Sequence, residues 1–512
     1  MFSPGKEILA DRRYLAYLID RYRSLGGYTG VLFCLIGLII VIPAVLALII
    51  PAERRMAIGF LLPGFALILL GTVLRLLLRP EKNNVLSVAE GAAIVVVAWS
   101  AAIIAGAVPF LWAGLDTTRA LFEATSGWTT TGLSVVDVSK VSPLLLFFRS
   151  LMQLAGGAGL AILMLSSISG PAGVALTTAE GRSDQLVPQV RQSARLVLKL
   201  YSVYILLGVA ALKFTGMDWL DAINHTFCAV STGGFSTKAD SIAFWNSPRI
   251  EAVLIVLMLL GATNFLTVYT LAHGRFRNIF RNGELRLTTT ILPLSIAILF
   301  FGVTFYGYGK MSEQIRAAIF QAVTALSTTG YATVSLNGWN SLGLMVIMVL
   351  MLIGGGTGST AGGIKQHRIF LLLKGLKKEF TEIFLPPNTI SEEAFWVGSR
   401  RRFLVEKDLR NAGLYIALYL FSWLAGGLAL SAFGHPVADS LFEFASALGT
   451  VGLSVGVTSA AAPAGQLWIE IVGMLLGRLE FFVIFWGIIK IGSDLSIFIP
   501  EIYAKKSEEE SI

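Results

Sequence analysis

The order of apolar and polar positions along the chain predicts helices of two lengths. Long apolar runs at 31–50, 57–78 and 86–110 have about the length that crosses a bilayer. The apolar stretch at 117–129 is shorter, and such stretches are typical of re-entrant segments. A threonine- and glycine-rich cluster follows it, and then another long apolar run at 144–168. The pattern predicts a span, a re-entrant helix, a polar turn and a second span.

This order recurs three more times, so the chain contains an internal repeat. The later copies are predicted at 196–214, 219–230 and 250–272, at 290–308, 314–326 and 342–353, and at 411–433, 437–448 and 467–491. We therefore expect an all-α integral membrane protein with about ten spans: four pseudo-symmetric repeats and an extra N-terminal helix pair. The predicted divisions are 1–84 for the N-terminal segment and pair, then 85–181, 182–288, 289–399 with a broken second helix, and 400–512 with the C-terminal tail.

The four polar clusters align without gaps. They read Thr129-Thr130-Thr131-Gly132-Leu133, Ser231-Thr232-Gly233-Gly234-Phe235, Ser327-Thr328-Thr329-Gly330-Tyr331 and Gly449-Thr450-Val451-Gly452-Leu453. The last glycine recurs in every copy, and a threonine stands two positions before it each time. Four such matches in register, each after a short apolar helix, point to a shared role.

Glycine permits positive φ angles, so successive backbone carbonyls can point the same way without a Cβ clash. Four such strands around a central pore would form rings of oxygen atoms that replace the hydration shell of a monovalent cation. The C-terminal dipoles of the short helices would also favour a cation in the pore. The predicted ion ligands are Thr130, Thr131, Gly132, Thr232, Gly233, Gly234, Thr328, Thr329, Gly330, Thr450, Val451 and Gly452.

Composition supports a membrane protein and excludes other classes. Hydrophobic residues make up 55% of the 512 positions and charged residues 14%, with a mean hydropathy of +0.73. Only two cysteines occur, Cys34 and Cys228, so a disulfide scaffold is excluded. The net charge of +8 comes from basic residues between the spans, which the positive-inside rule places in the cytoplasm with both termini. We expect no nucleic-acid partner and, because no catalytic motif occurs, no enzyme.

A second unusual stretch, 354–363, predicts a gate. Its glycines are Gly354, Gly355, Gly356, Gly358, Gly362 and Gly363. The stretch lacks the spacing of a phosphate-binding loop, and irregular backbone at membrane depth is tolerated where it lines a cavity. Lys365 follows it directly. Arg478 lies within the last predicted span, where a charge is costly, so we expect it under the clusters as a barrier or as a tie to this stretch.

With these residues in view, the chain resembles the Trk/Ktr/HKT superfamily of potassium transporters, and within it the TrkH-like membrane subunits. The stretches 231–236, 354–363 and 477–480 carry the resemblance, which covers nearly the whole chain. It implies potassium uptake across the inner (cytoplasmic) membrane through a filter of backbone carbonyls. It also implies a homodimer regulated by a cytosolic TrkA-type nucleotide-binding ring, with K⁺ as the permeant ion and no organic cofactor.

Two alternatives remain open at this point. Within the superfamily, the rival is a sodium-coupled or sodium-permeable transporter. Gly233 and Val451 stand where the other two copies have threonine, which leaves the strength of potassium selectivity open. Outside this mechanism, a cation/proton-coupled secondary transporter would need a midplane site with buried titratable residues. The spans are poor in Asp and Glu, which disfavours the second alternative.

Overall fold

The computed structural model describes residues 4–78, 86–158, 190–274, 282–307, 309–386, 392–397 and 400–509. Among these residues, six helices are long and apolar enough to cross a membrane. Two bent helix pairs raise this number to eight if each pair is one span, compared with the ten or so predicted. Strands are limited to one small hairpin in the described chain, so the predicted all-α class is confirmed.

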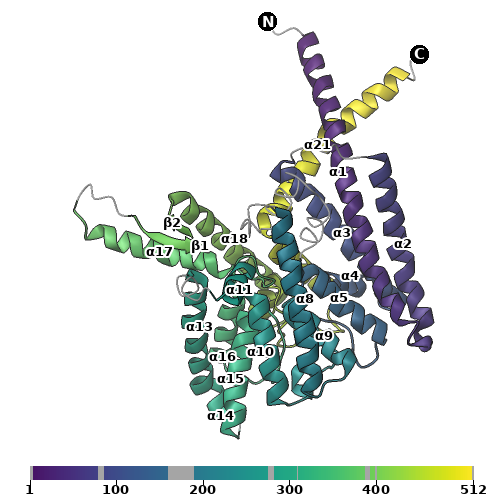
Figure 1. The fold of residues 1–512 in the computed structure, drawn as a ribbon. Coiled ribbons are helices and arrows are strands. Elements are labelled where there is room, and N and C mark those ends of the chain that lie inside the picture. The colour runs from purple at the N-terminus through teal and green to yellow at the C-terminus, as the bar shows by residue number, and fades with distance from the viewer. Residues whose placement is uncertain are drawn as a thin grey trace.

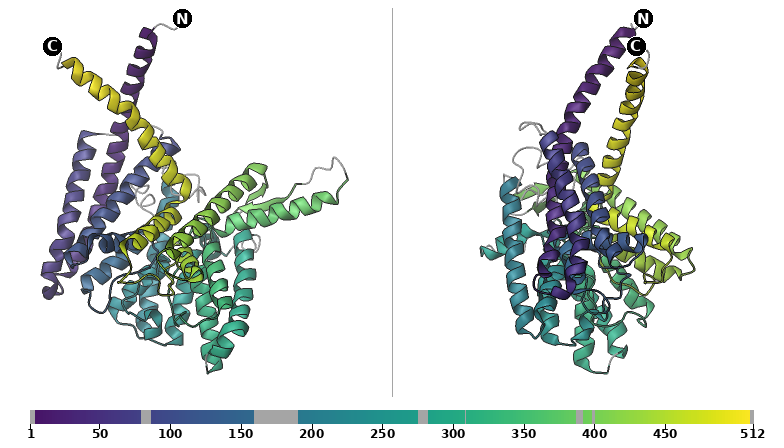
Figure 2. Two further views of the ribbon diagram at one scale, coloured as in Figure 1. Left: turned by 180° about the vertical axis from the view of Figure 1, so that it is seen from behind. Right: turned by 90° about the vertical axis from the view of Figure 1, so that its right-hand side faces the viewer.

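Two N-terminal helices form a pair along one side of the molecule (Figure 1). Helix α1 (Pro4–Leu46) packs against α2 (Arg54–Leu77), and the short turn η1 (Pro51–Glu53) joins them. Glycines line their contact: Gly30 lies against the carbonyl of Gly71, and Gly37 against that of Gly64. Small residues of this kind let two helix backbones approach closely in a membrane. Both chain ends extend from the same end of the molecule (Figures 1 and 2).

Helix α1 begins much earlier than the first span predicted at 31–50, and its candidate span runs Tyr17–Leu46. The prediction began too late because charged residues, Arg21 among them, interrupt the apolar pattern before residue 31. In the structure Arg21 Nε donates to Glu90 Oε1 at 2.7 Å, and both residues are largely buried. Because the charge of Arg21 is paired with Glu90, α1 continues through this position without a break.

Four units of the same element order follow. The first has α3 (Val88–Trp112), α4 (Thr117–Trp128) and α5 (Pro143–Ala158). The second has α8 (Val190–Phe214), α9 (Trp219–Val230), η2 (Ser241–Phe244), α10 (Pro248–Ala262) and α11 (Phe265–Ala272). The third has α13 (Gly283–Leu299), the π-helical turn η3 (Phe300–Thr304), α14 (Phe305–Gly307), α15 (Met311–Leu326), α16 (Ser341–Ile353) and α17 (Gln366–Ile383). The fourth has α18 (Glu406–Ser431), α19 (Val437–Leu448), α20 (Ala464–Leu479) and α21 (Phe481–Glu509).

The short helices α4, α9, α15 and α19 lie where the sequence predicted re-entrant segments, and their C-terminal halves are buried. The largest difference is at α15, which begins at Met311 rather than at 314. The first helix of the third unit begins at Gly283, so the division predicted after 288 falls inside α13. The divisions predicted at 84, 181 and 399, and the end of the run predicted at 144–168, lie outside the described residues.

The second helices of the second and fourth units are broken, which the sequence analysis did not predict. The run expected at 250–272 bends by 113° between α10 and α11, and the run expected at 467–491 bends by 100° between α20 and α21. Asn264 caps α11 by accepting from Leu266 N at 2.8 Å, and Glu480 takes a left-handed φ of 54°. Hydropathy did not reveal either break, because apolar residues continue on both sides of each one.

A hairpin and α17 extend from the bundle on one side (Figures 1 and 2). Strand β1 (Ala394–Val397) pairs antiparallel with β2 (Arg400–Phe403). Glu393, just before the hairpin, accepts from Lys374 Nζ and Lys377 Nζ of α17, each at 2.8 Å. These two hydrogen bonds lower the pKa of Glu393 below its ordinary value, and the bond with Lys374 has the larger effect. The ion pairs therefore tie the hairpin to the helix.

Candidate functional site

Each short helix ends in the same turn, with a threonine in the left-handed conformation. These threonines have φ angles between 50° and 57°, and they are Thr130, Thr232, Thr328 and Thr450. In the first unit Thr130 N donates to Gly127 O at 3.1 Å and Thr131 N to Ser126 O at 2.9 Å. This is a Schellman turn, and the other three units have the same two bonds. A left-handed, β-branched residue costs about 1–3 kcal/mol, so four equal cases indicate a shared role.

Two residues later, a glycine of each unit contacts the next unit, and the contacts close into a ring. The glycine lies against a backbone carbonyl oxygen of its neighbour: Gly132 against Gly233, Gly234 against Thr329, Gly330 against Val451, and Gly452 against Thr131. The last contact returns to the first unit. A Cβ at any of the four glycines would overlap that oxygen, and their φ angles are all positive, from 74° to 95°. The four clusters singled out in the sequence therefore lie together.

The hydroxyls of the left-handed threonines are of two kinds. Those of Thr130 and Thr450 are buried and have no hydrogen-bond partner among the described residues. The other two hydroxyls bond the glycine-rich stretch. The Thr232 hydroxyl donates to Thr360 Oγ1 at 3.2 Å, and the Thr328 hydroxyl accepts from Gly362 N at 2.7 Å. A buried oxygen without a partner is costly. The hydroxyl oxygens of Thr130 and Thr450 are therefore groups that could coordinate a cation.

Gln153 of α5 supports the second cluster from behind, and the sequence analysis missed it. Its Nε2 donates to Gly233 O at 2.6 Å, and its Oε1 accepts from Phe235 N at 3.2 Å. The side chain is fully buried. One lone pair of the Gly233 carbonyl is thus occupied by the protein. A polar amide inside an otherwise apolar run was the signal available in the sequence.

Four polar residues share one position of the short helices, and three of them bond the segment that follows the ring. Glu123 accepts from Ser134 Oγ at 2.7 Å, Glu443 accepts from Ser454 Oγ at 2.6 Å, and His225 Nε2 lies 3.0 Å from the hydroxyl of Ser236. The fourth is Gln321, whose amide has no hydrogen-bond partner in the described part of the chain.

A cavity of about 370 Å³ opens on the glycine side of the ring and is lined by all four ring glycines. Asp137 and Lys238 also line it. Hydrogen bonds from Ser139 and from the Lys140 ammonium lower the pKa of Asp137 to about 2. Asp137 is therefore anionic at any physiological pH, and its charge is paired with the ammonium of Lys140 at 2.9 Å.

The glycine-rich stretch lies on the threonine side of the ring. Helix α16 ends at Gly354, whose φ is 71°. Gly362 lies so close to the carbonyl of Gly449 and the hydroxyl of Thr450 that a Cβ there would overlap both. Thr360 anchors the stretch to α10, since its Oγ1 and its N both donate to Gly261 O, at 2.9 and 3.1 Å. The irregular backbone predicted for 354–363 is thus packed directly beneath the ring.

Arg478 and Lys365, both singled out in the sequence, contact this stretch. Arg478 Nη1 donates to Thr360 O at 2.8 Å, and Nη2 bonds the carbonyls of Gly156 and Gly157. Lys365 Nζ donates to Ala361 O, and its own backbone is left-handed with φ of 80°. Of the two roles expected for Arg478, the structure shows the tie to the stretch.

Glu480 pairs with Arg368 rather than with Arg478. The Arg368 guanidinium lies 2.5 Å from Glu480 Oε2 and 3.7 Å from the centre of the Tyr415 ring. Arg368 belongs to the first turn of α17, and Glu480 stands at the break between α20 and α21. The exit of the glycine-rich stretch is therefore tied to the broken helix of the fourth unit.

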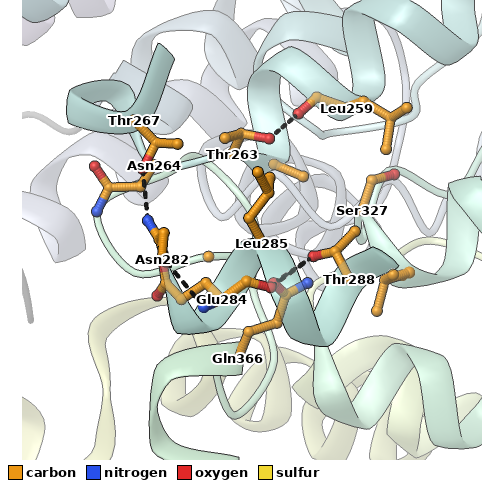
Figure 3. Close-up of a pocket in the computed structure, with 13 residues that line it drawn as sticks. Leu259, Thr263, Asn264, Thr267, Asn282, Glu284, Leu285, Thr288, Ser327 and Gln366 are labelled. Atoms are coloured by element: carbon orange, nitrogen blue, oxygen red, sulfur yellow. Dashed lines mark hydrogen bonds between the residues drawn. The ribbon is translucent and has the colours of Figure 1, made fainter. Parts of the chain in front are cut away.

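A polar cavity lies beside the stretch, between the second and third units (Figure 3). Asn264, Glu284, Thr288 and Gln366 line it, and its volume of about 30 Å³ admits a water molecule. Glu284 Oε1 accepts from Thr357 N at 2.8 Å, and Gln366 Nε2 donates to Gly354 O at 3.0 Å. Both residues hold the stretch from α13 and α17, and the sequence analysis missed both.

Comparisons with known proteins identify the family. Residues 58–494 match the TrkH family model, described as a cation transport protein. The Trk system potassium uptake protein TrkH of Escherichia coli K12 is 31% identical over 90% of this chain and 97% of its own length. A cation transporter of Methanocaldococcus jannaschii is 29% identical over 88% of this chain and 92% of its own. The crystal structure of the potassium transporter TrkH from Vibrio parahaemolyticus superposes with a TM-score of 0.79 at 26% identity, covering 91% of this chain and 98% of that one. The chain is a membrane protein that belongs to the TrkH family of cation transport proteins.

Proposed function

We propose that this protein takes up potassium through the ring formed by its four threonine–glycine clusters. The observation that carries the proposal is the closure of the ring, in which each glycine packs on a carbonyl of the next unit. The carbonyls of residues 130–132, 232–234, 328–330 and 450–452 would then replace the hydration shell of K⁺. The buried hydroxyls of Thr130 and Thr450, without protein partners in the described chain, would add ligands at the lower end.

The stretch 354–363 acts in this proposal as the gate below the filter. Its backbone sits under the ring, and Arg478, Lys365 and Glu284 hold it there through hydrogen bonds to its backbone. An ion leaving the threonine side meets this stretch and the positive charge of Arg478. Opening would require the Arg478 bonds to three carbonyls to be broken or shifted.

The family supports a regulatory assembly on the cytoplasmic face. We infer a homodimer in the inner membrane, with both termini cytoplasmic and a TrkA-type nucleotide-binding ring beneath it. Both chain ends emerge on the same side of the molecule, which agrees with this orientation (Figure 2). Arg401 and Arg402 on β2 are exposed and offer a basic surface to such a partner.

Reversal potentials of the purified protein in liposomes test the function. Under a potassium gradient the current should reverse near the potassium equilibrium potential, and a sodium or pH gradient should move the reversal little. A reversal that follows sodium would instead support the sodium-permeable alternative. A reversal that follows pH would support a proton-coupled transporter.

A further inference from the structure

Two carboxylates of the fourth unit are buried together behind the ring. Glu443 of α19 and Glu470 of α20 are each 0% exposed. Thr458 connects them, because its N donates to Glu443 Oε1 at 3.0 Å while its Oγ1 lies 2.9 Å from Glu470 Oε2. The two acids therefore share a single bridging residue in a region closed to water.

In the first unit the corresponding carboxylate is paired with an arginine, whereas the two carboxylates of the fourth unit have no such cation beside them among the described residues. Glu123, at the same short-helix position as Glu443, has Arg149 Nε 3.1 Å from its Oε2. In the part of the chain that the structure describes, neither Glu443 nor Glu470 has a lysine, arginine or histidine nitrogen within 4.0 Å. The fourth unit thus has a second carboxylate, that of Glu470, near the place where the first unit has the guanidinium of Arg149.

Other titratable groups near the pair have partners of their own. His435 Nε2 lies 3.0 Å from Gln466 Oε1, and Gln466 Nε2 in turn donates to Glu470 Oε1. Arg119 of α4 pairs with Asp116 and donates to the carbonyls of Ala460 and Ala462. Glu123 and Arg149 form their own pair, and Asp439 on α19 is partly exposed, in the first turn of that helix. Two buried carboxylates without a counter-ion do not both ionise, because each charged form disfavours the other.

The hydrogen bonds distinguish the two acids. Glu443 receives three donors, from Ser454 Oγ at 2.6 Å, Val455 N at 3.1 Å and Thr458 N at 3.0 Å. Glu470 receives only side-chain donors, the Thr458 hydroxyl and Gln466 Nε2 at 3.2 Å. Backbone N–H donors stabilise the charged form, so Glu443 is the better anion. A hydroxyl can reverse its role, so a protonated Glu470 can donate to Thr458 Oγ1.

We propose that Glu443 and Glu470 form a proton-binding site, in which Glu443 is ionised and Glu470 carries the proton at neutral pH. The site acts on the ring through Glu443, which holds Ser454, Val455 and Thr458 in the segment directly after Gly452. Loss of the proton places a second negative charge on the other side of Thr458. The repulsion weakens the hydrogen bonds that hold residues 454–458, and the preference of the filter for potassium over sodium falls as the pH rises.

Infrared spectroscopy of the purified protein tests the proton site independently of transport. One protonated-carboxyl band should disappear on alkaline titration, and Glu470→Gln should remove that band at neutral pH. Glu251→Gln is the matched control, since Glu251 is buried but lies 2.5 Å from Arg316 and should be ionised. Thr458→Val keeps the shape of the side chain but removes a hydroxyl that can donate to the Glu470 carboxylate, so the proton should be released at a higher pH. A titrating band that survives in Glu470→Gln overturns the assignment.

Transport selectivity tests the coupling, and this part rests on the proposed function. The wild type should lose potassium preference over sodium at alkaline pH, whereas Glu470→Gln should keep it across the same range. A wild-type preference that does not change with pH, with the infrared band titrating, would overturn the coupling. Absence of potassium preference at every pH would overturn the proposed function and leave the infrared result standing.

Discussion

Arg478 and Thr360 are 118 positions apart in the chain, yet Arg478 Nη1 donates to the Thr360 carbonyl at 2.8 Å. This bond joins the end of α20 to the centre of the glycine-rich stretch. Thr360 in turn bonds α10 through Gly261 O, so three units meet at one residue. The position of the stretch depends on side chains contributed by helices that are remote in sequence.

Arg478→Ala should raise basal ion flux. The change removes a positive charge below the ring and the hydrogen bonds to three carbonyls, each worth about 1.5–3 kcal/mol when the donor is charged. Flux of a radioactive potassium analogue into proteoliposomes measures the effect. Arg478→Lys is the control, because it keeps the charge but not the forked geometry. Equal flux in wild type and both variants of folded protein would contradict a gating role.

Gly330→Ser should weaken potassium selectivity while the protein still assembles. The new Cβ would overlap Val451 O, and the φ of 87° is unfavourable for serine. We expect the potassium-to-sodium permeability ratio to fall about tenfold, equivalent to about 1.4 kcal/mol. Bi-ionic reversal potentials report the ratio. Gly338→Ser is the matched control, because Gly338 also has a positive φ but a Cβ there meets nothing within 4 Å. The same loss in both variants would contradict a specific role of the ring.

Glu284→Ala should release the glycine-rich stretch on its α13 side. Thr357 N would lose its acceptor at 2.8 Å, and a hydrogen bond to a charged acceptor contributes about 1.5–3 kcal/mol. Hydrogen exchange of the amides at 354–363 should become faster in this variant. Glu284→Gln keeps an acceptor oxygen and should exchange more slowly than the alanine variant. Unchanged exchange in Glu284→Ala would show that the stretch is held by other contacts.

Changing Arg400, Arg401 and Arg402 to glutamate should weaken docking of the proposed cytosolic ring. The substitution reverses three charges on one hairpin strand and opposes the electrostatic steering of an acidic partner. Co-purification with the cognate ring protein at two salt concentrations measures the loss. Lys140→Glu is the control, since Lys140 is 82% exposed and lies in the loop after the first cluster. Equal binding by the wild type, the triple variant and Lys140→Glu would exclude this hairpin as the docking site.

The sequence predicted the elements that depend on local pattern. The short helices and the positive φ of Gly132, Gly234, Gly330 and Gly452 follow from apolar length and from glycine itself, and the structure has both. The left-handed threonines were not predicted, because threonine gives no local signal for that conformation. They are held there by the Schellman turn and by packing against the next unit.

What the sequence could not predict depends on contacts between distant segments. Gln153, Glu284 and Gln366 were missed because their roles are defined by the backbone groups they bond, 80, 73 and 12 positions away. The early start of α1 was missed for the same reason, since Arg21 in this helix pairs with Glu90, 69 positions later. The breaks at Asn264 and Glu480 escaped detection because polar residues inside an apolar run do not reveal whether the helix continues through them.

The closed ring of glycine–carbonyl contacts has a consequence for how this protein can vary. In an assembly of four identical subunits, one mutation alters every quadrant of the pore simultaneously. Here each quadrant is encoded separately, and Gly233 and Val451 already differ from Thr131 and Thr329 at the same place in the ring. On the proposed function, a single substitution would therefore change one quarter of the ion's coordination shell and leave the backbone carbonyls of the other three units in place.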